Sequence, residues 1–204
     1  MIEIPPQYLM IDLCSGLGGA SEAFHLSSDW EVIRVENNPL LQDVPGTIAL
    51  DIRKFEQSFM MDDTDDVDLI WFSPPCTEFS NAYHAPSPTA KREGISFEPN
   101  MEILECGLRI IEKKNPTYFV IENVAGAIKY FESYLGRPRQ IIGPFVLWGA
   151  FPYLNLSDFF HSKYENDTWS SDPLRANKRG KIPYEISQAL YRAFFEQKRL
   201  DEWY

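Results

Sequence analysis

Short apolar runs alternate with stretches of helical periodicity as far as about residue 135. The runs that predict strands cover residues 8–13, 31–35, 47–50, 67–72 and 118–121. Apolar positions three or four residues apart predict helices over residues 20–26, 101–115 and 125–135, with Gly136 as a stop signal. This alternation predicts a doubly wound, mostly parallel α/β sheet.

The pattern changes beyond residue 135. Residues 145–148 and 156–160 predict a pair of strands, which would form an antiparallel edge of the sheet. A last helix is expected to open at Ile182-Pro183-Tyr184-Glu185, because proline is tolerated in a first helical turn. Segments without a clear period predict irregular connections or loops over residues 53–66, 77–100 and 166–181.

The formal net charge of the 204-residue chain is -11, which is unusual for a protein that binds nucleic acid without specificity. The charge is unevenly spread, since acid is dense over residues 62–68 and base gathers at 91–92, 137–139 and 175–181. A basic face opposite an acidic back is one interpretation. Solvated surface charge is the simpler interpretation of any one cluster.

The three cysteines are odd in number and include no Cys-x-x-Cys pair, which argues against a disulfide framework and a cysteine-rich zinc site. No apolar run approaches the length of a membrane span, and the N-terminus lacks the pattern of a secretion signal. We therefore expect a single domain, 1–204, in a reducing cytoplasm, without metal or membrane.

Cys76 follows an apolar strand and two prolines, in the sequence Ser73-Pro74-Pro75-Cys76. The prolines end the strand sharply, so the thiol would lie at the carboxyl end of a strand, where open α/β sheets bind ligands. A nucleophile and a small buried hydrophobe are equally good interpretations of this stretch alone. The long segment 77–100 begins beside the thiol, so we expect it to be an active-site loop. The strand over residues 118–121 ends in Glu122, which places a carboxylate at the same edge.

A glycine-rich turn, Ser15-Gly16-Leu17-Gly18-Gly19, connects the first strand to the first helix. This arrangement lets a backbone approach a nucleotide-like ligand closely. Glu36 ends the second strand roughly twenty residues later, where an acid typically binds ribose hydroxyls. Asp51, after the third strand, is a second candidate contact.

Three motifs together resemble the cytosine-5 DNA methyltransferase family. Residues 12–20, Asp-Leu-Cys-Ser-Gly-Leu-Gly-Gly-Ala, resemble its first motif. Pro74-Pro75-Cys76 with Phe79-Ser80 is similar to its catalytic motif, and Glu122-Asn123-Val124 is identical to its Glu-Asn-Val motif. Residues 182–187 are a looser match to its last motif, a helix that packs beside the first. The size resembles that of phage-encoded forms, which implies a bacterial or phage-infected cell.

The resemblance implies S-adenosyl-L-methionine as methyl donor and duplex DNA with a flipped cytosine as partner. The turn would contact the methionine part, Glu36 the ribose, and Asp51 and Ile52 the adenine. The donor-binding residues that the resemblance implies are Leu13, Ser15, Gly16, Gly18, Gly19, Glu36, Asn37, Asp51, Ile52 and Pro74. The implied catalytic residues are Cys76, Glu122 and Arg139, and the implied substrate-binding residues are Pro75, Ser80, Asn123 and Arg137.

The chemistry explains two of these residues. The Cys76 thiolate would add to carbon 6 of cytosine and so make carbon 5 nucleophilic. Glu122 would hydrogen-bond ring nitrogen 3 and the exocyclic amine, which stabilises charge that develops on the ring.

The chain departs from the family in two ways. The Gln-Arg-x-Arg type motif is absent, and Arg137 and Arg139 are its nearest substitutes. Residues 149–181 are too few for a separate target-recognition domain, so a second copy, a partner or the loop 77–100 would have to supply specificity. Methylation of a free nucleotide or of RNA, and a catalytically silent DNA-binding homologue, are the alternative functions.

Overall fold

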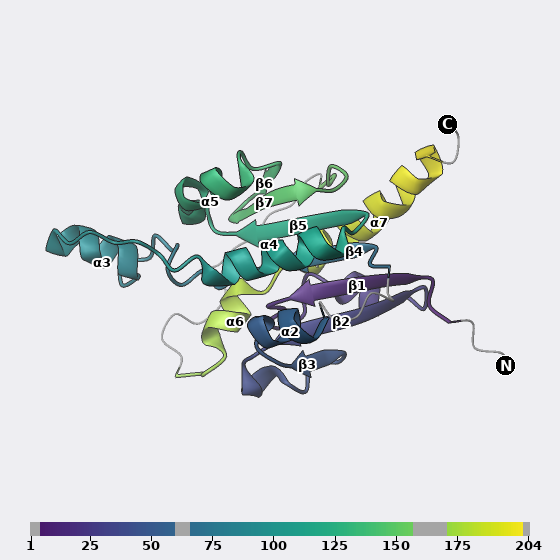
Figure 1. Ribbon diagram of the computed structural model, residues 1–204, viewed down its shortest axis with the longest axis horizontal. Helices are drawn as coiled ribbons and strands as arrows, with labels where there is room; N and C mark the ends of the chain where they lie inside the picture. The colour runs from purple at the N-terminus through teal and green to yellow at the C-terminus, as the bar shows by residue number, and fades with distance from the viewer. Residues whose placement is uncertain (1–4, 60–65, 157–170, 202–204) are drawn as a thin grey trace.

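The computed structural model describes residues 5–59, 66–156 and 171–201. A mixed sheet of seven strands runs through these residues in the order β3-β2-β1-β4-β5-β7-β6. The strands are β1 (Tyr8–Leu13), β2 (Trp30–Glu36), β3 (Thr47–Ala49), β4 (Leu69–Phe72), β5 (Tyr118–Asn123), β6 (Gln140–Ile142) and β7 (Phe145–Ala150). This order confirms the expected doubly wound sheet, because the chain moves outward from β1 in one direction and returns to β4 (Figure 1).

The first five strands are parallel, and β7 pairs with β5 in the opposite direction, so the expected antiparallel edge is confirmed. We expected β7 to pair with a strand over residues 156–160, and this prediction was wrong because β5 and β6 occupy both sides of β7. The hairpin partner is β6, which pairs Ile142 with Phe145 across the turn at Gly143-Pro144. Residues 157–160 lie outside the described residues, and Leu156 is not in a strand.

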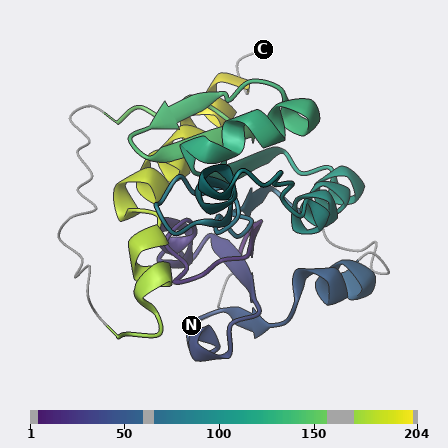
Figure 2. The same cartoon turned by 90° about the vertical axis from the view of Figure 1, so that its left-hand side faces the viewer.

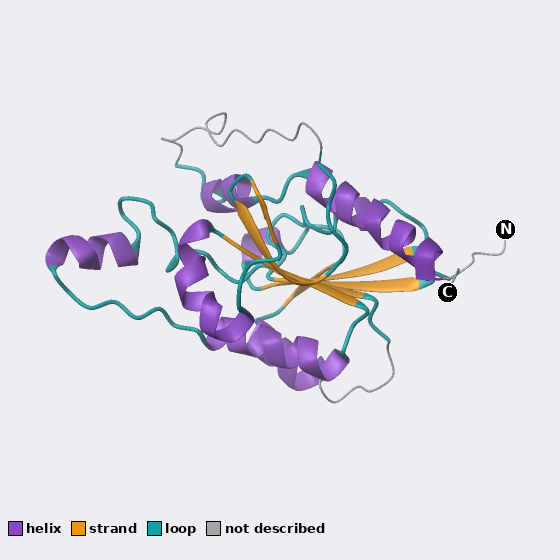
Figure 3. Ribbon diagram, turned by 90° about the horizontal axis from the view of Figure 1, so that it is seen from above, coloured by secondary structure: helices purple, strands orange, loops and turns teal. Residues whose placement is uncertain are grey.

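Helices cover both faces of the sheet (Figure 3). On one face, α1 (Glu22–His25) and α7 (Tyr184–Asp201) pack over apolar side chains of the sheet that include Met10, Val32, Trp71 and Leu147. On the other face lie α2 (Ile52–Phe59), α4 (Glu102–Lys114) and α5 (Ile128–Leu135), over Ile11, Ile70, Phe72 and Ile121. No helix in the described ranges is long and apolar enough to cross a membrane.

The last helix packs against the first, as the motif resemblance implied. Ser187 of α7 is fully buried, and its hydroxyl donates to the Ala20 carbonyl at 2.6 Å. The same hydroxyl accepts from the Ala23 backbone N–H at 3.0 Å. A serine in this helix therefore satisfies two polar backbone groups at the start of α1.

Three segments expected to be irregular contain helices. The helix α2 replaces the first part of the connection 53–66, because Ile52 and Phe55 share a face that is buried against α4. The helix α3 (Pro86–Glu93) lies within the segment 77–100, with a proline in its first turn and Gly94 as a left-handed cap. The helix α6 (Arg175–Gly180) lies within the segment 166–181, of which residues 166–170 are not described.

Short 3-10 turns complete the chain. One turn, η1 (Pro39–Leu41), follows β2, and its start is capped by Asn38, which accepts from the Leu40 N–H. The other, η2 (Ala125–Ala127), leads from β5 into α5. Both lie after strand ends at the carboxyl edge of the parallel strands.

Candidate active site

The candidate site lies at the carboxyl edge of the parallel strands, which faces the viewer in Figure 2. The glycine turn follows β1, Glu36 ends β2, Cys76 follows β4, and Glu122 lies near the end of β5. These four segments come from adjacent strands of the sheet. The fold therefore brings the three motif segments and Glu36 to one edge, as the topology of such sheets requires.

Cys76 is the exposed cysteine of the chain, whereas Cys106 is buried and Cys14 is half-buried. The Pro74-Pro75 pair ends β4, and a tight turn follows Cys76. The Cys76 carbonyl accepts hydrogen bonds from the N–H groups of Phe79, at 3.1 Å, and Ser80, at 3.0 Å. The backbone that carries the thiol is therefore held on its carboxyl side.

Asn123 joins the segment of Cys76 to the strand of Glu122. Its side-chain nitrogen donates to the Pro74 carbonyl at 2.9 Å, and its side-chain oxygen accepts from the Val124 N–H at 2.9 Å. Asn123 is buried, and its neighbour Glu122 is nearly so, at 9 % exposure. Substrate binding by Asn123 stays a prediction, since in this structure the amide spans the two motifs.

Glu36 holds the glycine turn through its carboxylate. One oxygen accepts from the Gly16 N–H and the other from the Asn38 N–H, each at 2.8 Å. The Ser15 hydroxyl, in the same turn, is buried and has no hydrogen-bond partner among the described residues. A polar ligand with hydroxyl or amine groups would give this orphaned oxygen a partner.

The segment around α6 lies over the glycine turn, and sequence reasoning missed this contact. A Cβ placed on Gly19 would collide with the Ile182 carbonyl, and one on Gly16 would lie 3.8 Å from the Asn177 amide nitrogen. Lys181 forms a 2.8 Å ion pair with Glu22 at the start of α1. Figure 2 shows α6 beside the purple N-terminal segment. Asn177 is thus a neighbour of the turn that no strand or helix signal identified.

Asp51 and Asn37 lie together after β3 and β2. The Arg53 guanidinium, which binds both Asp51 carboxylate oxygens, holds the pKa of that carboxyl well below its usual range, with a smaller contribution from the Asn37 side chain. Ile52 is 4 % exposed and, like Leu13, belongs to the core beneath this edge. Contacts of Asp51 and Ile52 with adenine stay predictions.

Arg137 and Arg139 lie just before β6, the edge strand of the sheet. Arg137 and Arg139 are exposed, and the Arg139 guanidinium lies 5.4 Å from the centre of the Phe151 ring. Phe151 follows the end of β7, which runs antiparallel to β5 and so ends at the opposite edge of the sheet. Catalysis by Arg139 and substrate binding by Arg137 stay predictions.

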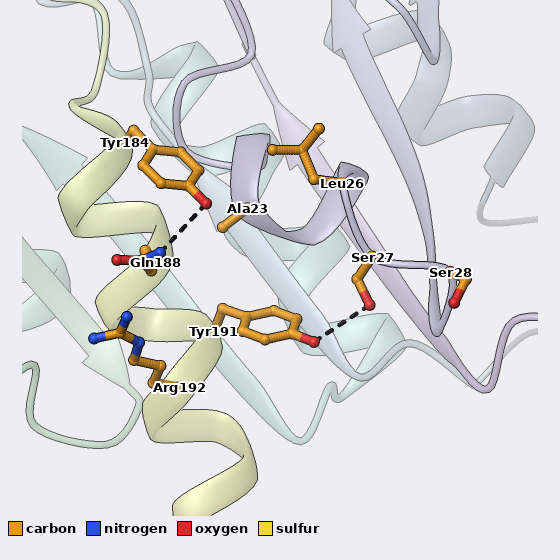
Figure 4. Close-up of a pocket in the computed structure, with 8 residues that line it drawn as sticks. All are labelled: Ala23, Leu26, Ser27, Ser28, Tyr184, Gln188, Tyr191 and Arg192. Carbon is orange, nitrogen blue, oxygen red and sulfur yellow. Dashed lines mark hydrogen bonds between the residues drawn. The ribbon is translucent and has the colours of Figure 1, made fainter.

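A surface cleft between α1 and α7 is separate from the candidate site (Figure 4). Two hydrogen bonds line it, from Gln188 to the Tyr184 hydroxyl and from Tyr191 to Ser27. None of the sequence-predicted site residues lines it. Within the described ranges, no group of three or more His, Cys, Asp or Glu side chains could hold a metal ion.

Two curated proteins are similar to part of this chain. Type II methyltransferase M.AquIA of Picosynechococcus sp. is 30% identical over 132 residues, which cover 59% of this chain and 50% of that protein. Type II methyltransferase M.BsuFI of Bacillus subtilis is 31% identical over 126 residues, 58% of this chain and 27% of that protein. The chain thus spans about half the length of the first relative and less of the second.

A solved structure, described as a DNA modification methyltransferase encoded within a prophage of E. coli, is 19% identical, with a TM-score of 0.43 over 70% of this chain and 46% of that chain. The profile of the C-5 cytosine-specific DNA methylase family matches residues 8–134, which include the glycine turn, Cys76 and Glu122. Since this match covers more than half of the chain, the protein belongs to the C-5 cytosine-specific DNA methylase family.

Proposed function

We propose that this protein methylates carbon 5 of cytosine in duplex DNA through a covalent adduct with Cys76. One observation carries the proposal. The hydrogen bond from Asn123 to the Pro74 carbonyl holds the segment of an exposed thiol against the strand of a largely buried carboxylate, Glu122. Nucleophile and acid are the two groups that addition to the cytosine ring needs.

Cys76 and Glu122 would act on different atoms of the cytosine ring. The Cys76 thiolate forms a bond to carbon 6, and Glu122 donates to or shares a proton with ring nitrogen 3, so that the ring electrons shift toward carbon 5. After carbon 5 has received its methyl group, loss of the carbon 5 proton restores the double bond and expels the Cys76 thiolate. Burial of Glu122 strengthens its hydrogen bond to the ring, because water competes less there.

The residues at the glycine turn fit S-adenosylmethionine, which supplies an electrophilic methyl group when bound. The orphaned Ser15 hydroxyl and the Gly16 and Gly18 backbone belong to the turn that would contact the donor. The Glu36 carboxylate, fixed by two backbone amides, is placed to accept from ribose hydroxyls. Asn37 and Asp51 lie beside it, where a base would follow the ribose.

The segment 77–100 projects from the body of the protein and suits DNA binding. Figure 1 shows α3 at the far end of this arm. None of the residues of α3 is buried, and Lys91 and Arg92 lie in its last turn. The Arg92 guanidinium stacks 3.9 Å from the centre of the exposed Tyr83 ring. Basic and aromatic side chains on one arm can bind phosphates and stack on an extruded base.

Methyl transfer from tritiated S-adenosylmethionine tests the proposal directly. We expect label in duplex DNA and not in RNA or deoxycytidine monophosphate. Cys76→Ser should abolish transfer and leave donor binding nearly intact, because a serine hydroxyl is a far weaker nucleophile near neutral pH. Label in RNA or in the nucleotide alone would assign the site to a different substrate.

The covalent step has its own test. Duplex DNA with 5-fluorocytosine at the target position has no carbon 5 proton to lose after methyl transfer, so the thiol cannot be expelled. We expect a protein–DNA adduct that survives denaturing electrophoresis with wild-type protein and not with Cys76→Ser. Transfer to ordinary DNA without an adduct on the fluorinated duplex would contradict the covalent route.

A further inference from the structure

Arg34 is a buried arginine on β2, directly opposite Asp12 in the pairing of β1 with β2. Its residue exposure is 3 %, and that of Asp12 is 1 %. Charged side chains are rarely buried to this degree unless they are paired and hydrogen-bonded. The strand pattern of the sequence showed no reason for a charge at either position.

The fully buried Ser21 connects the two charges. Its hydroxyl donates to one Asp12 carboxylate oxygen at 2.6 Å and accepts from the Arg34 Nε at 2.8 Å. The other Asp12 oxygen has no partner among the described residues. Burial raises the pKa of Asp12 to about 7, against the opposing effects of Ser21 and Arg34.

The Arg34 guanidinium also reaches two separate loops. One terminal nitrogen donates to the Gly18 carbonyl at 3.4 Å, and the other donates to the Pro45 carbonyl in the connection before β3. Gly18 has a φ of 70°, and a Cβ there would lie 2.6 Å from the Arg34 Nε. The arginine therefore packs directly beneath the glycine turn, which only glycine at residue 18 permits.

We propose that Arg34 is a positioning residue for the methyl donor, because it fixes the glycine turn from below through Gly18 and Ser21. The inference rests on the proposed function, in which the turn contacts the methionine part of the donor. Glu36 lies two residues further along β2 and holds the Gly16 end of the same turn. Arg34 and Glu36 thus hold two different points of the turn from one strand.

The planar guanidinium explains why an arginine serves here. Its nitrogens point in fixed, divergent directions, so one side chain can bind Ser21, Gly18 and Pro45 at the same time. A lysine ammonium would keep the positive charge near Asp12 but could not reach all three acceptors. Arg34→Lys therefore separates the geometry of the side chain from its charge.

Two ligands separate positioning of the turn from general stability. S-adenosylmethionine carries the methionine part, and 5′-methylthioadenosine lacks the amino-acid group but keeps ribose and adenine. We expect Arg34→Lys to weaken binding of S-adenosylmethionine by about tenfold, the size of a missing hydrogen bond to a charged group, and to change binding of 5′-methylthioadenosine by less than about twofold. The KM for the donor should rise while kcat at saturating donor stays near the wild-type value.

Ser21→Ala provides a second variant, since it removes the acceptor of the Arg34 Nε without a change of charge. It should show the same selective loss in a smaller degree. Ile186→Val, on the buried face of α7, and Arg192→Lys, on the surface cleft, are controls for altered packing and for the arginine-to-lysine change. Both controls should bind the two ligands as the wild type does, and thermal melting should show that all variants fold.

The outcomes distinguish this inference from the proposed function. Equal weakening of both ligands, or no weakening of either, by Arg34→Lys and Ser21→Ala would overturn the positioning role alone. A wild-type protein that binds neither ligand would overturn the proposed function and this inference with it. If Arg34→Lys does not fold, the selectivity of Ser21→Ala decides.

Discussion

Three cysteines occupy environments that differ in exposure and in neighbouring charge. Cys76 is exposed, after a rigid proline turn. Burial, with the carboxylates of Glu36 and Asp12 nearby, raises the pKa of Cys14 far above its usual value. Burial and the hydrogen bond to Glu56 raise the pKa of Cys106 to about 12. Since the thiolate is the reactive form, the environment alone separates the proposed nucleophile from two structural cysteines.

This difference predicts selective alkylation. Iodoacetamide at pH 8 should modify Cys76 first, and peptide mass spectrometry should find Cys14 and Cys106 unmodified while the protein stays folded. In denaturant, all three should react. Early modification of Cys106 in the folded protein would show that its pairing with Glu56 does not suppress the thiolate.

The role of Glu36 predicts a second selective effect. Glu36→Ala should weaken donor binding by about 1–3 kcal/mol, because it removes both the acceptor for the ribose hydroxyls and the support of Gly16. Glu31→Ala, an exposed acid on the same strand, is the matched control and should leave the affinity unchanged. Isothermal titration calorimetry measures both. Equal affinities of the two variants would leave Glu36 with a structural role only.

At the scale of elements, the sequence predicted the strands and helices that have a regular pattern of apolar residues and missed those that have none. The strands β1 to β5 and the helices α4 and α7 follow from apolar runs or stripes that the core requires. The helices α3 and α6 have no buried residues, so no stripe could mark them, although Pro86 and Gly94 flank α3. The strand β6 was missed because it has only three residues, and the clearest sequence signal for it is the turn at Gly143-Pro144 that follows it.

Some residues of the candidate site could likewise be predicted from the sequence, and others could not. Cys76, Glu122 and Glu36 could be placed from the sequence because each follows or ends a strand, and parallel strands end at one edge. The network of Asp12, Ser21 and Arg34 could not be found, since it depends on the register of β1 with β2. The catalytic role of Arg139 stays a prediction, because the structure shows only its contact with Phe151, beyond the end of β7.

The helix α6 supplies a prediction about DNA. Neutralisation of Arg175, Lys178 and Arg179 together should weaken binding of all duplex sequences about equally, since phosphate contacts position without specifying. The slope of log affinity against log salt should flatten by about one unit for each phosphate that the variant no longer neutralises. Lys178 should contribute less than Arg179, because it already pairs with Asp172 at 2.5 Å.

Lys113→Gln with Lys114→Gln is the control for this charge change. These lysines end α4 at the opposite edge of the sheet, just before β5. Fluorescence anisotropy over a range of salt should give the control the wild-type slope. A salt-independent affinity of the wild type would instead point to a free-nucleotide substrate.

At the scale of the whole molecule, Asp12 links folding to pH. Its pKa is raised from 3.8 to about 7 in the folded protein, so between these values the unfolded chain has lost a proton that the folded chain keeps. The free energy of unfolding should therefore fall as pH rises from about 4 to about 7 and level off above. The charged groups that face Asp12 in this window are Arg34, which opposes the shift, and Glu36, which adds to it.

Urea denaturation of wild type and Asp12→Asn between pH 5 and pH 8 measures this contribution. Burial and Arg34 lower the pKa of His25, so that group acts in the opposite direction, and the difference between the two proteins isolates Asp12. We expect the variant to gain stability relative to wild type as pH rises. A constant difference over the whole range would show that Asp12 titrates as an ordinary carboxyl.

The link between Asn123 and Pro74 holds the two proposed catalytic groups together apart from the arm that is proposed to contact DNA. The thiol segment is anchored as far as Ser80, and a side chain on Gly126, just beyond Glu122, would collide with the Phe79 carbonyl. Within this anchored segment, the Glu78 carboxylate accepts a 2.6 Å hydrogen bond from the Asn100 N–H, which closes the base of the arm. Under the proposed function, evolution or an engineer can therefore exchange residues 81–99 for an arm suited to another DNA sequence, while the segments of the thiol and the carboxylate keep their spacing.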